Sequence, residues 1–323
     1  MNNNFLSFVK DAQNKGDLKY LENHPLSSVS SMGTGGKARF FVTPHTAGTL
    51  IETLKAAEKS SISYALIGNA TNVLFSDDGF DGAVISTKRI NGIYLKDGMI
   101  YVESGTSLPA LSGFALENGF SGFEGLVSIP ATVGGALTSN AGAFGCEIAD
   151  RLVSFSVYIP SKDRIEVRTP KSHPFSYRKS SATDGGAVIL SASFSADVGD
   201  RDEIFAKMMQ NKEKRKLTQP IGVKSVGSFF KRPSYTEENK AVSVAYYGKS
   251  AGELIDLCGL KGKRAGGAEV SKKHAGFIIN SGNATTGDVL ALANEVKKAV
   301  FEKTGVKLCE ECVKIEADKK QNV

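Results

Sequence analysis

A glycine-rich stretch with almost no charge, residues 119–148, constrains the fold of this chain more than any other feature. It contains seven glycines, and Glu124 is its only charged residue before Glu147. Glycine lets the backbone adopt positive φ and lets a ligand approach it closely. Exposed backbone N–H groups in such turns form concave anion sites. A single Gly-Gly pair is typical of an ordinary turn. A run of this length, with small side chains such as Ala136 and Ala143, favours a large ligand that carries phosphate.

Length and charge limit the class of protein. With 323 residues, the chain is long enough for two or three domains. The formal net charge of +6 is modest and suits an anionic small molecule. No block of lysine and arginine interleaved with aromatic residues occurs, so we expect no nucleic-acid partner.

The N-terminus lacks the basic region and long apolar run of a signal peptide. No apolar run reaches membrane-spanning length, so we expect a cytoplasmic protein with no membrane partner. The four cysteines fit reduced thiols in that compartment. Cys309 and Cys312 form a C-x-x-C pattern, but inside a predicted strand rather than at the start of a helix. We expect no metal site.

Secondary-structure signals predict a β-α-β unit near the N-terminus. Residues 47–60 have the apolar spacing of a helix capped by Thr46, and residues 64–67 and 83–86 have the composition of buried strands. The polar loop 68–72 follows the first of these strands, where ligands of α/β sheets commonly bind. No G-x-G-x-x-G fingerprint occurs, so a dinucleotide would need a different fold. A helix at 107–118 and a last strand at 306–315 are also predicted.

Four local patterns could carry chemistry, and each has an ordinary structural alternative. Arg178 can bind a carboxylate through both arms of its guanidinium group, or it can lie in a basic turn. Ser228 can donate a proton, or it can belong to a packed turn, since no G-x-S-x-G elbow surrounds it. Glu310 and Glu311 would ordinarily form a solvated strand face, and Lys216 would ordinarily end a helix.

Several motifs resemble one family. The segment SIPATVGGALTSNAGAFG is similar to the flavin-binding signature of UDP-N-acetylenolpyruvoylglucosamine reductases, and GNATN resembles their GxGSN loop. YRKS, VGSFFKRP, the Lys216-Leu217 pair and LCEEC resemble further family motifs in the same order, so that the likeness spans about residues 24 to 316. The chain departs from the family pattern at Ala70, Thr71, Ala131, Ser139 and Arg232.

This resemblance implies an α+β fold with a two-part FAD-binding region of the vanillyl-alcohol-oxidase/PCMH type and a smaller α/β substrate-binding domain. We place the two FAD-binding subdomains at 1–88 and 89–217, and the substrate-binding domain at 218–323, with its C-terminal strand returning to the active site. The implied cofactor-binding residues are Gly68, Asn69, Ala70, Thr71, Asn72, Pro130, Ala131, Thr132, Val133, Gly134, Gly135, Asn140, Ala141, Gly142 and Ala143. Neither loop contains a histidine that could tether the flavin, so we expect non-covalent FAD.

The implied reaction uses NADPH to reduce FAD. The reduced flavin then delivers hydride to C3 of the enolpyruvyl ether of UDP-N-acetylglucosamine, giving the peptidoglycan precursor UDP-N-acetylmuramate. Arg178, with Glu311 in its protonated form, would stabilise the charge that develops, and Ser228 would donate the proton to C2. Of the two glutamates, Glu311 is the better candidate.

Tyr177, Lys216, Lys231 and Arg232 are the implied substrate-binding residues, with Arg232 in place of an asparagine that contacts the nucleotide in the family. The alternatives are another FAD-dependent oxidoreductase of the same fold, such as an alcohol or lactone oxidase, and a non-catalytic nucleotide-binding protein.

Overall fold

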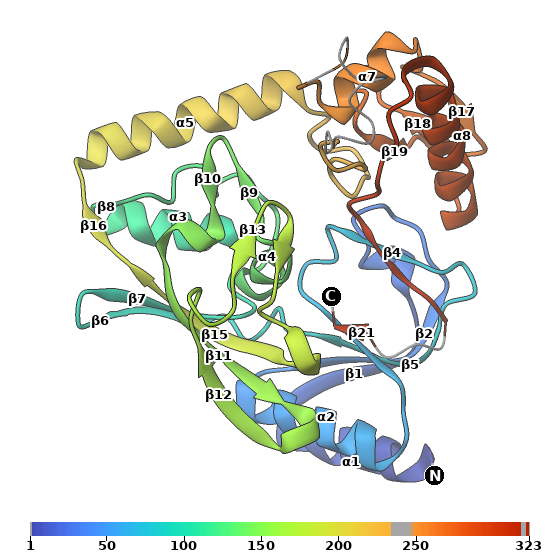
Figure 1. The fold of residues 1–323 in the computed structure, drawn as a ribbon. Coiled ribbons are helices and arrows are strands. Elements are labelled where there is room, and N and C mark those ends of the chain that lie inside the picture. Colours follow the sequence, from blue (N-terminus) through green and yellow to red (C-terminus); the bar gives the residue numbers. More distant parts are fainter. Residues whose placement is uncertain (1, 234–245, 247, 318–320, 323) are drawn as a thin grey trace.

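The fold is taken from a computed structural model, which describes residues 2–233, 246, 248–317 and 321–322 (Figure 1). Its helices are α1 (Asn2–Lys15), α2 (Ala47–Lys59), α3 (Leu108–Glu117), α4 (Val133–Ser139), α5 (Arg201–Thr218), α7 (Ala251–Leu257) and α8 (Thr286–Thr304). No helix in these ranges is long and apolar enough to cross a membrane.

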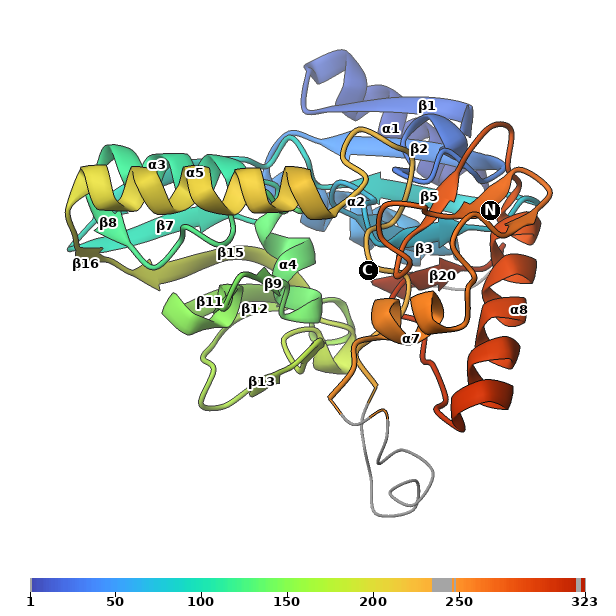
Figure 2. The same ribbon diagram turned by 90° about the horizontal axis from the view of Figure 1, so that it is seen from above.

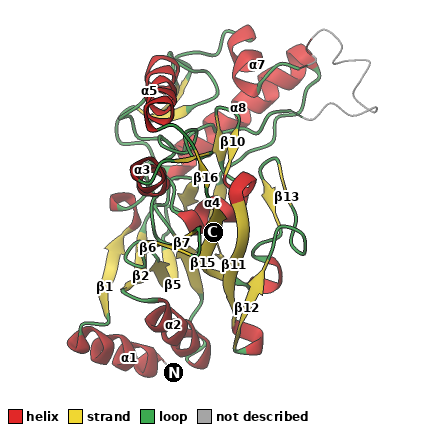
Figure 3. Ribbon diagram, turned by 90° about the vertical axis from the view of Figure 1, so that its left-hand side faces the viewer, coloured by secondary structure: helices red, strands yellow, loops and turns green. Residues whose placement is uncertain are grey.

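The first sheet has five strands in the order β1-β2-β5-β3-β21. They are β1 (Leu18–Pro25), β2 (Lys37–Pro44), β5 (Phe80–Ser86), β3 (Tyr64–Ile67) and β21 (Gln321–Asn322). β2, β5 and β3 pair in parallel, as the predicted β-α-β unit requires. Thr46 caps α2 by accepting the N–H of Thr49, and Leu50 and Leu54 pack from α2 against the sheet in one core with Phe5 of α1. Figure 3 shows α1 and α2 at the end of the molecule opposite α7.

The second sheet also has five strands, in the antiparallel order β12-β11-β15-β7-β6. They are β12 (Arg164–Arg168), β11 (Leu152–Ile159), β15 (Val188–Ser195), β7 (Met99–Glu103) and β6 (Ile93–Lys96). Its core includes Leu108 and Leu111 of α3 and Val133 of α4. Ser107 caps α3, Pro109 lies in its first turn, and Gly119 follows its end at φ 70°, which confirms the predicted helix.

A third core lies in the C-terminal part of the chain, where α7 and α8 pack with a three-stranded sheet in the order β17-β18-β19. The strands are β17 (Arg264–Ala265), β18 (Ala268–Val270) and β19 (Ile278–Asn280). Seen from above, α5 lies over α3 on one side of the molecule and α8 lies on the other (Figure 2). The C-terminal strand β20 (Val313–Ile315) returns to pair in parallel with β4 (Val73–Phe75).

Short two-stranded sheets complete the fold. They pair β8 (Phe120–Ser121) with β16 (Asp197–Val198), β9 (Gly142–Ala143) with β10 (Cys146–Glu147), and β13 (Phe175–Ser176) with β14 (Lys179–Ser180).

The predicted last strand at 306–315 is too long. The strand covers Val313–Ile315 alone, because the backbone before it pairs with a different segment, residues 229–231. The N–H of Lys231 donates to the carbonyl of Cys309, and the N–H of Glu311 donates to the carbonyl of Phe229, at 2.8 Å each. Val313 then donates to the carbonyl of Asn72. The change of partner between 311 and 313 shortens the strand and leaves Glu311 at the junction. The division into domains at 88 and 217 stays a prediction.

Candidate active site

A cavity of about 490 Å³ opens between the two sheets and the C-terminal part of the chain. Most of the predicted cofactor residues line it: Gly68, Asn69, Ala70, Thr71, Asn72, Pro130, Ala131, Thr132, Gly135, Ala141, Gly142 and Ala143. Arg178, Ser228 and Glu311 line the same cavity. The remaining cofactor candidates lie behind this wall, with Val133 in the core, Asn140 buried and Gly134 in a smaller neighbouring cavity.

The loop 68–72 and the start of α4 are held against each other. Asn69 Nδ2 donates to the carbonyl of Pro130 at 3.0 Å, and Thr132 caps α4 by accepting the N–H of Gly135. The backbone N–H groups of Asn69, Ala70 and Thr71 make no hydrogen bond within the described ranges, although they line the cavity. Free N–H donors along a cavity wall are suited to the phosphate oxygens of a dinucleotide. The residues present therefore fit FAD.

Gly68 lies where the two loops touch. A Cβ at this position would lie 2.2 Å from Thr132 Oγ1, which caps α4. We expect Gly68→Ala to separate the loops and weaken FAD binding at least tenfold, measured as flavin released on dilution of the purified protein. Gly113→Ala is the matched control, because its Cβ would meet nothing within 4 Å in α3. Alanine in place of that helical glycine should stabilise the fold by about 0.5–1 kcal/mol. Equal flavin retention in both variants would contradict this account of Gly68.

Two of the departures from the family pattern have different structural consequences. Ala70 is buried and has φ 49°, a left-handed conformation that glycine adopts without strain. Ala131 does not have positive φ, so its side chain costs no backbone strain. The turn at Ala131 is therefore compatible with the family's loop.

Arg178 is fixed from several directions in the tight turn between β13 and β14. Its Nε donates to Glu311 Oε1 at 2.7 Å, across 133 residues of sequence, and its Nη2 donates to the carbonyl of Gly142 at 2.9 Å. The guanidinium carbon lies 5.1 Å from the centre of the Tyr177 ring. Arg178 itself has φ 52°, and strained backbone of this kind is common at functional sites. The hairpin of β9 and β10, through the carbonyl of Gly142, thus helps to orient the arginine.

The two adjacent glutamates point to different sides. Glu311 faces the cavity and Arg178, whereas Glu310 is held by Lys297 at 2.7 Å and Lys314 at 2.6 Å. Burial raises the pKa of Glu311, and Arg178 and Lys231 offset that rise in part. The two lysines outweigh burial at Glu310 and lower its pKa. A buried carboxyl with a raised pKa can hold a proton, so the geometry favours Glu311 for acid chemistry.

Ser228 is exposed to the cavity and follows Gly227, which has φ 81°. The next residues tie it to the C-terminal segment, because the carbonyl of Phe229 accepts the N–H of Glu311 and Phe230 forms a bridge with Glu310. The described part of the chain provides no hydrogen-bond partner for the Ser228 hydroxyl, which is therefore available to a ligand.

The predicted substrate residues lie outside the lining of the main cavity. Tyr177 lies beside the cavity, and its hydroxyl accepts the N–H of Arg232 at 3.4 Å. Lys231, Arg232 and Tyr177 are not among the residues that line the cavity. Lys216 is exposed on α5 and lies outside the lining as well, and its carbonyl accepts a hydrogen bond from Lys273.

Sequence reasoning missed Arg215 and Gln219, which line the cavity at the C-terminal end of α5. Arg215 lies in the basic run 212–216, and nothing in that run singles it out as the residue that faces the cavity. Helical spacing from the buried Ile204, Met208 and Asn211 would have placed Arg215 on the inner face of α5.

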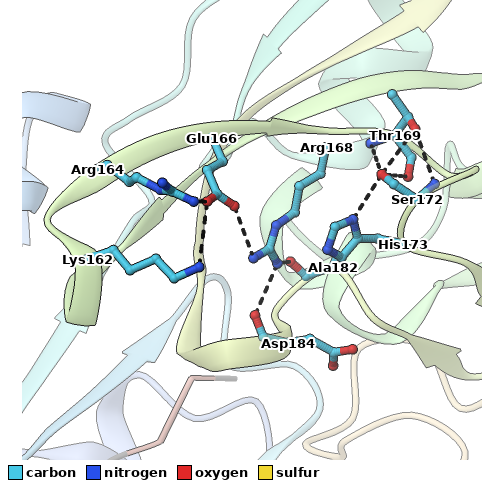
Figure 4. A network of polar contacts seen from close by, with 9 residues as sticks. All are labelled: Lys162, Arg164, Glu166, Arg168, Thr169, Ser172, His173, Ala182 and Asp184. Carbon is cyan, nitrogen blue, oxygen red and sulfur yellow. Dashed lines mark hydrogen bonds and ion pairs between the residues drawn. The ribbon is translucent and has the colours of Figure 1, made fainter.

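A smaller cavity of about 30 Å³ shares Gly68, Gly135 and Thr138 with the main one, and Thr183 closes part of it. Arg168 fixes the backbone around Thr183, since its Nη1 donates to the carbonyls of Ala182 at 2.9 Å and Asp184 at 3.1 Å (Figure 4). This buried arginine also pairs with Glu166 at 3.7 Å.

The described residues were considered for a metal site, and the cysteines for redox activity. No group of three or more His, Cys, Asp or Glu side chains among the described residues could hold a metal ion. Burial raises the pKa of Cys312 to about 12, and Cys309 is exposed. Burial likewise raises the pKa of Cys146 to about 11, which suits a structural thiol.

Comparison with known proteins gives the class and then the family. Residues 38–166 match the model of an FAD binding domain, and residues 219–315 match the C-terminal domain of UDP-N-acetylenolpyruvoylglucosamine reductase. The fold and its cavity are thus those of an FAD-dependent oxidoreductase.

Proteins of known name are similar to this chain over nearly its full length. The chain is 38% identical to the UDP-N-acetylenolpyruvoylglucosamine reductase of Caldicellulosiruptor bescii, over 94% of this chain and 92% of the relative. It is 39% identical to that of Geobacillus kaustophilus, over 91% and 92%. The crystal structure of the Thermus caldophilus reductase matches with a TM-score of 0.74 at 34% identity, covering 92% of this chain and 98% of that one.

The chain belongs to the UDP-N-acetylenolpyruvoylglucosamine reductase family. The predicted fold class, enzyme class and FAD cofactor are confirmed.

Proposed function

We propose that this protein reduces the enolpyruvyl group of UDP-N-acetylglucosamine enolpyruvate to give UDP-N-acetylmuramate, with NADPH as the source of hydride, in peptidoglycan precursor synthesis. The observation that carries the proposal is the convergence of Arg178, Ser228 and Glu311 on the cavity lined by both glycine-containing loops. Bound FAD would supply the hydride transfer. Its partners would be these small molecules, and both nucleotides are cytoplasmic metabolites, so we place the reaction in the cytoplasm.

Arg178 would bind the substrate carboxylate and stabilise the negative charge that grows on it as hydride adds to C3. The carbonyls of Gly142 and Asn140 already orient the guanidinium group, so little reorganisation is needed when the charge develops. A planar guanidinium group also matches a carboxylate through paired hydrogen bonds, which a lysine could not reproduce.

Glu311 would change its protonation state when substrate binds. In the structure its carboxylate pairs with Arg178, which partly offsets the effect of burial on its pKa. A substrate carboxylate that takes over Arg178 would remove this partner and add a negative charge nearby. Both effects favour the protonated form of Glu311. A protonated Glu311 can then donate a hydrogen bond to the reacting carboxylate.

Ser228 would deliver the proton to C2. A serine hydroxyl is a weak acid, but the carbanionic centre left by hydride addition is a strong base, so the transfer is favourable. The position of Ser228 is set by the backbone hydrogen bonds of the next residue, Phe229, with Gly276 and Glu311, rather than by its own side chain. Its hydroxyl can therefore reorient toward the substrate.

The purified protein is expected to be yellow and to release FAD, with no flavin left on the polypeptide, when it is denatured and filtered. The reason is that two loops lined by free N–H groups fit the cofactor, and neither contains a histidine for a covalent link. Absorbance of the filtrate and mass spectrometry of the chain measure both parts. A colourless protein that takes up no added FAD would contradict the assignment of this cavity.

A further inference from the structure

Arg215 is a cationic side chain in the wall of the main cavity, in the last turn of α5. Its Nε is buried and has no hydrogen-bond partner among the described residues. Burial lowers the pKa of the guanidinium group, which still stays charged at neutral pH. The next residue, Lys216, is exposed and lies outside the cavity lining.

Gln219 lies one helical turn further along the same wall, and its Oε1 is buried without a partner in the described part of the chain. The site therefore combines an unpaired cation, which needs an anion, with an unpaired acceptor, which needs an O–H or N–H donor. Leaving either group unpaired in a buried wall costs free energy. A ligand that supplies both partners would remove that cost.

We propose that Arg215 and Gln219 together bind the nucleoside diphosphate portion of a ligand. Arg215 contacts a pyrophosphate oxygen and Gln219 accepts a hydrogen bond from a hydroxyl or N–H group of the adjoining nucleoside. A carboxylate is a poorer match for this pair, because it offers no donor for Gln219 and Arg178 already provides a carboxylate site. The proposal rests on the proposed function, which brings two such ligands into the cavity, the UDP-sugar and FAD.

The test compares Arg215→Met with Lys212→Met, which removes an exposed charge from the same helix outside the cavity lining. UDP and uridine are titrated into the oxidised flavoprotein, with the flavin absorbance spectrum as the readout. Arg215→Met should raise the Kd for UDP about 10- to 100-fold, as expected for loss of a charge-assisted hydrogen bond. It should leave the Kd for uridine, which lacks phosphate, within about twofold. Lys212→Met should change neither Kd.

A second readout distinguishes the two sources of pyrophosphate. If Arg215 contacts the cofactor, Arg215→Met will release FAD faster on dilution while the Kd for UDP stays unchanged. Arg215→Lys keeps the charge and should give an intermediate loss in whichever readout responds.

Unchanged UDP affinity together with unchanged FAD release in a folded Arg215→Met protein would overturn the proposal. Such a result would make Arg215 a structural residue, and the thermal unfolding midpoint should then fall. Failure of the proposed function is distinguishable, because the unsubstituted protein would then lack FAD or fail to bind UDP.

Discussion

Replacing Ser228 with alanine is expected to slow reoxidation of the reduced enzyme by its enolpyruvyl substrate about 10²- to 10⁴-fold, the usual cost of losing a positioned general acid. Reduction by NADPH should keep its rate, since cofactor positioning depends on the loops around Gly68 and Gly135 and not on Ser228. Anaerobic stopped-flow spectroscopy follows the two half-reactions separately, as bleaching of the flavin with NADPH and return of its colour with substrate.

The structure supplies a control for this experiment. Ser225 also lines the cavity, but its backbone is tied to Ser31 and Ile279, away from Glu311. Ser225→Ala should leave both half-reactions within about threefold of their normal rates. Equal slowing of both half-reactions in Ser228→Ala would identify Ser228 as a packing residue. If neither slowed, the proton would have to come from another group, with Glu311 the next candidate.

The second large effect is expected from Glu311→Gln, with Glu310→Gln as its matched control. Loss of an acidic group in contact with Arg178 should slow the substrate half-reaction by about 10²-fold or more. Glu310→Gln removes the same charge one residue away, on the side of Lys297 and Lys314. It should cost stability but leave the half-reaction within about threefold of its normal rate.

The protonation state of Glu311 should also determine how the rate of the substrate half-reaction depends on pH. Because burial raises its pKa, Glu311 keeps its proton to a higher pH than an ordinary glutamate. If the protonated form is the active one, the substrate half-reaction declines as pH rises through that raised pKa. The decline should disappear in Glu311→Gln and persist in Glu310→Gln. Similar losses in both variants, or an unaltered profile in Glu311→Gln, would exclude Glu311 as the acid.

Helices whose ends are fixed by neighbouring residues could be predicted from the sequence. The helices that became α2 and α3 begin at Thr46 and Ser107 because side-chain hydroxyls cap them there, and capping is readable from adjacent residues. The last strand was predicted too long because VKLCEECVKI was interpreted as one strand, with β-branched Val306, Val313 and Ile315 at its two ends. Its backbone nevertheless changes partner at Glu311, and that change depends on segments about 80 and 240 residues away in the chain.

The candidate site could be assembled from sequence only through the family resemblance. Nothing local places Arg178 against Glu311, since their hydrogen bond joins positions 133 residues apart. At the end of α5 the resemblance indicated Lys216, whereas the rotation of the helix turns the neighbouring Arg215 toward the cavity. Which of two adjacent basic residues faces a ligand is decided by the packing of the helix, here through the buried Ile204 and Met208.

The measurement that tests the central claim most directly is the visible spectrum of the anaerobic purified protein during two successive additions. NADPH alone should bleach the flavin band. Subsequent UDP-N-acetylglucosamine enolpyruvate, without oxygen, should restore the band stoichiometrically and yield UDP-N-acetylmuramate. A band that NADPH leaves unchanged, or one that returns with oxygen but not with the enolpyruvyl substrate, would contradict the claim and favour an oxidase instead.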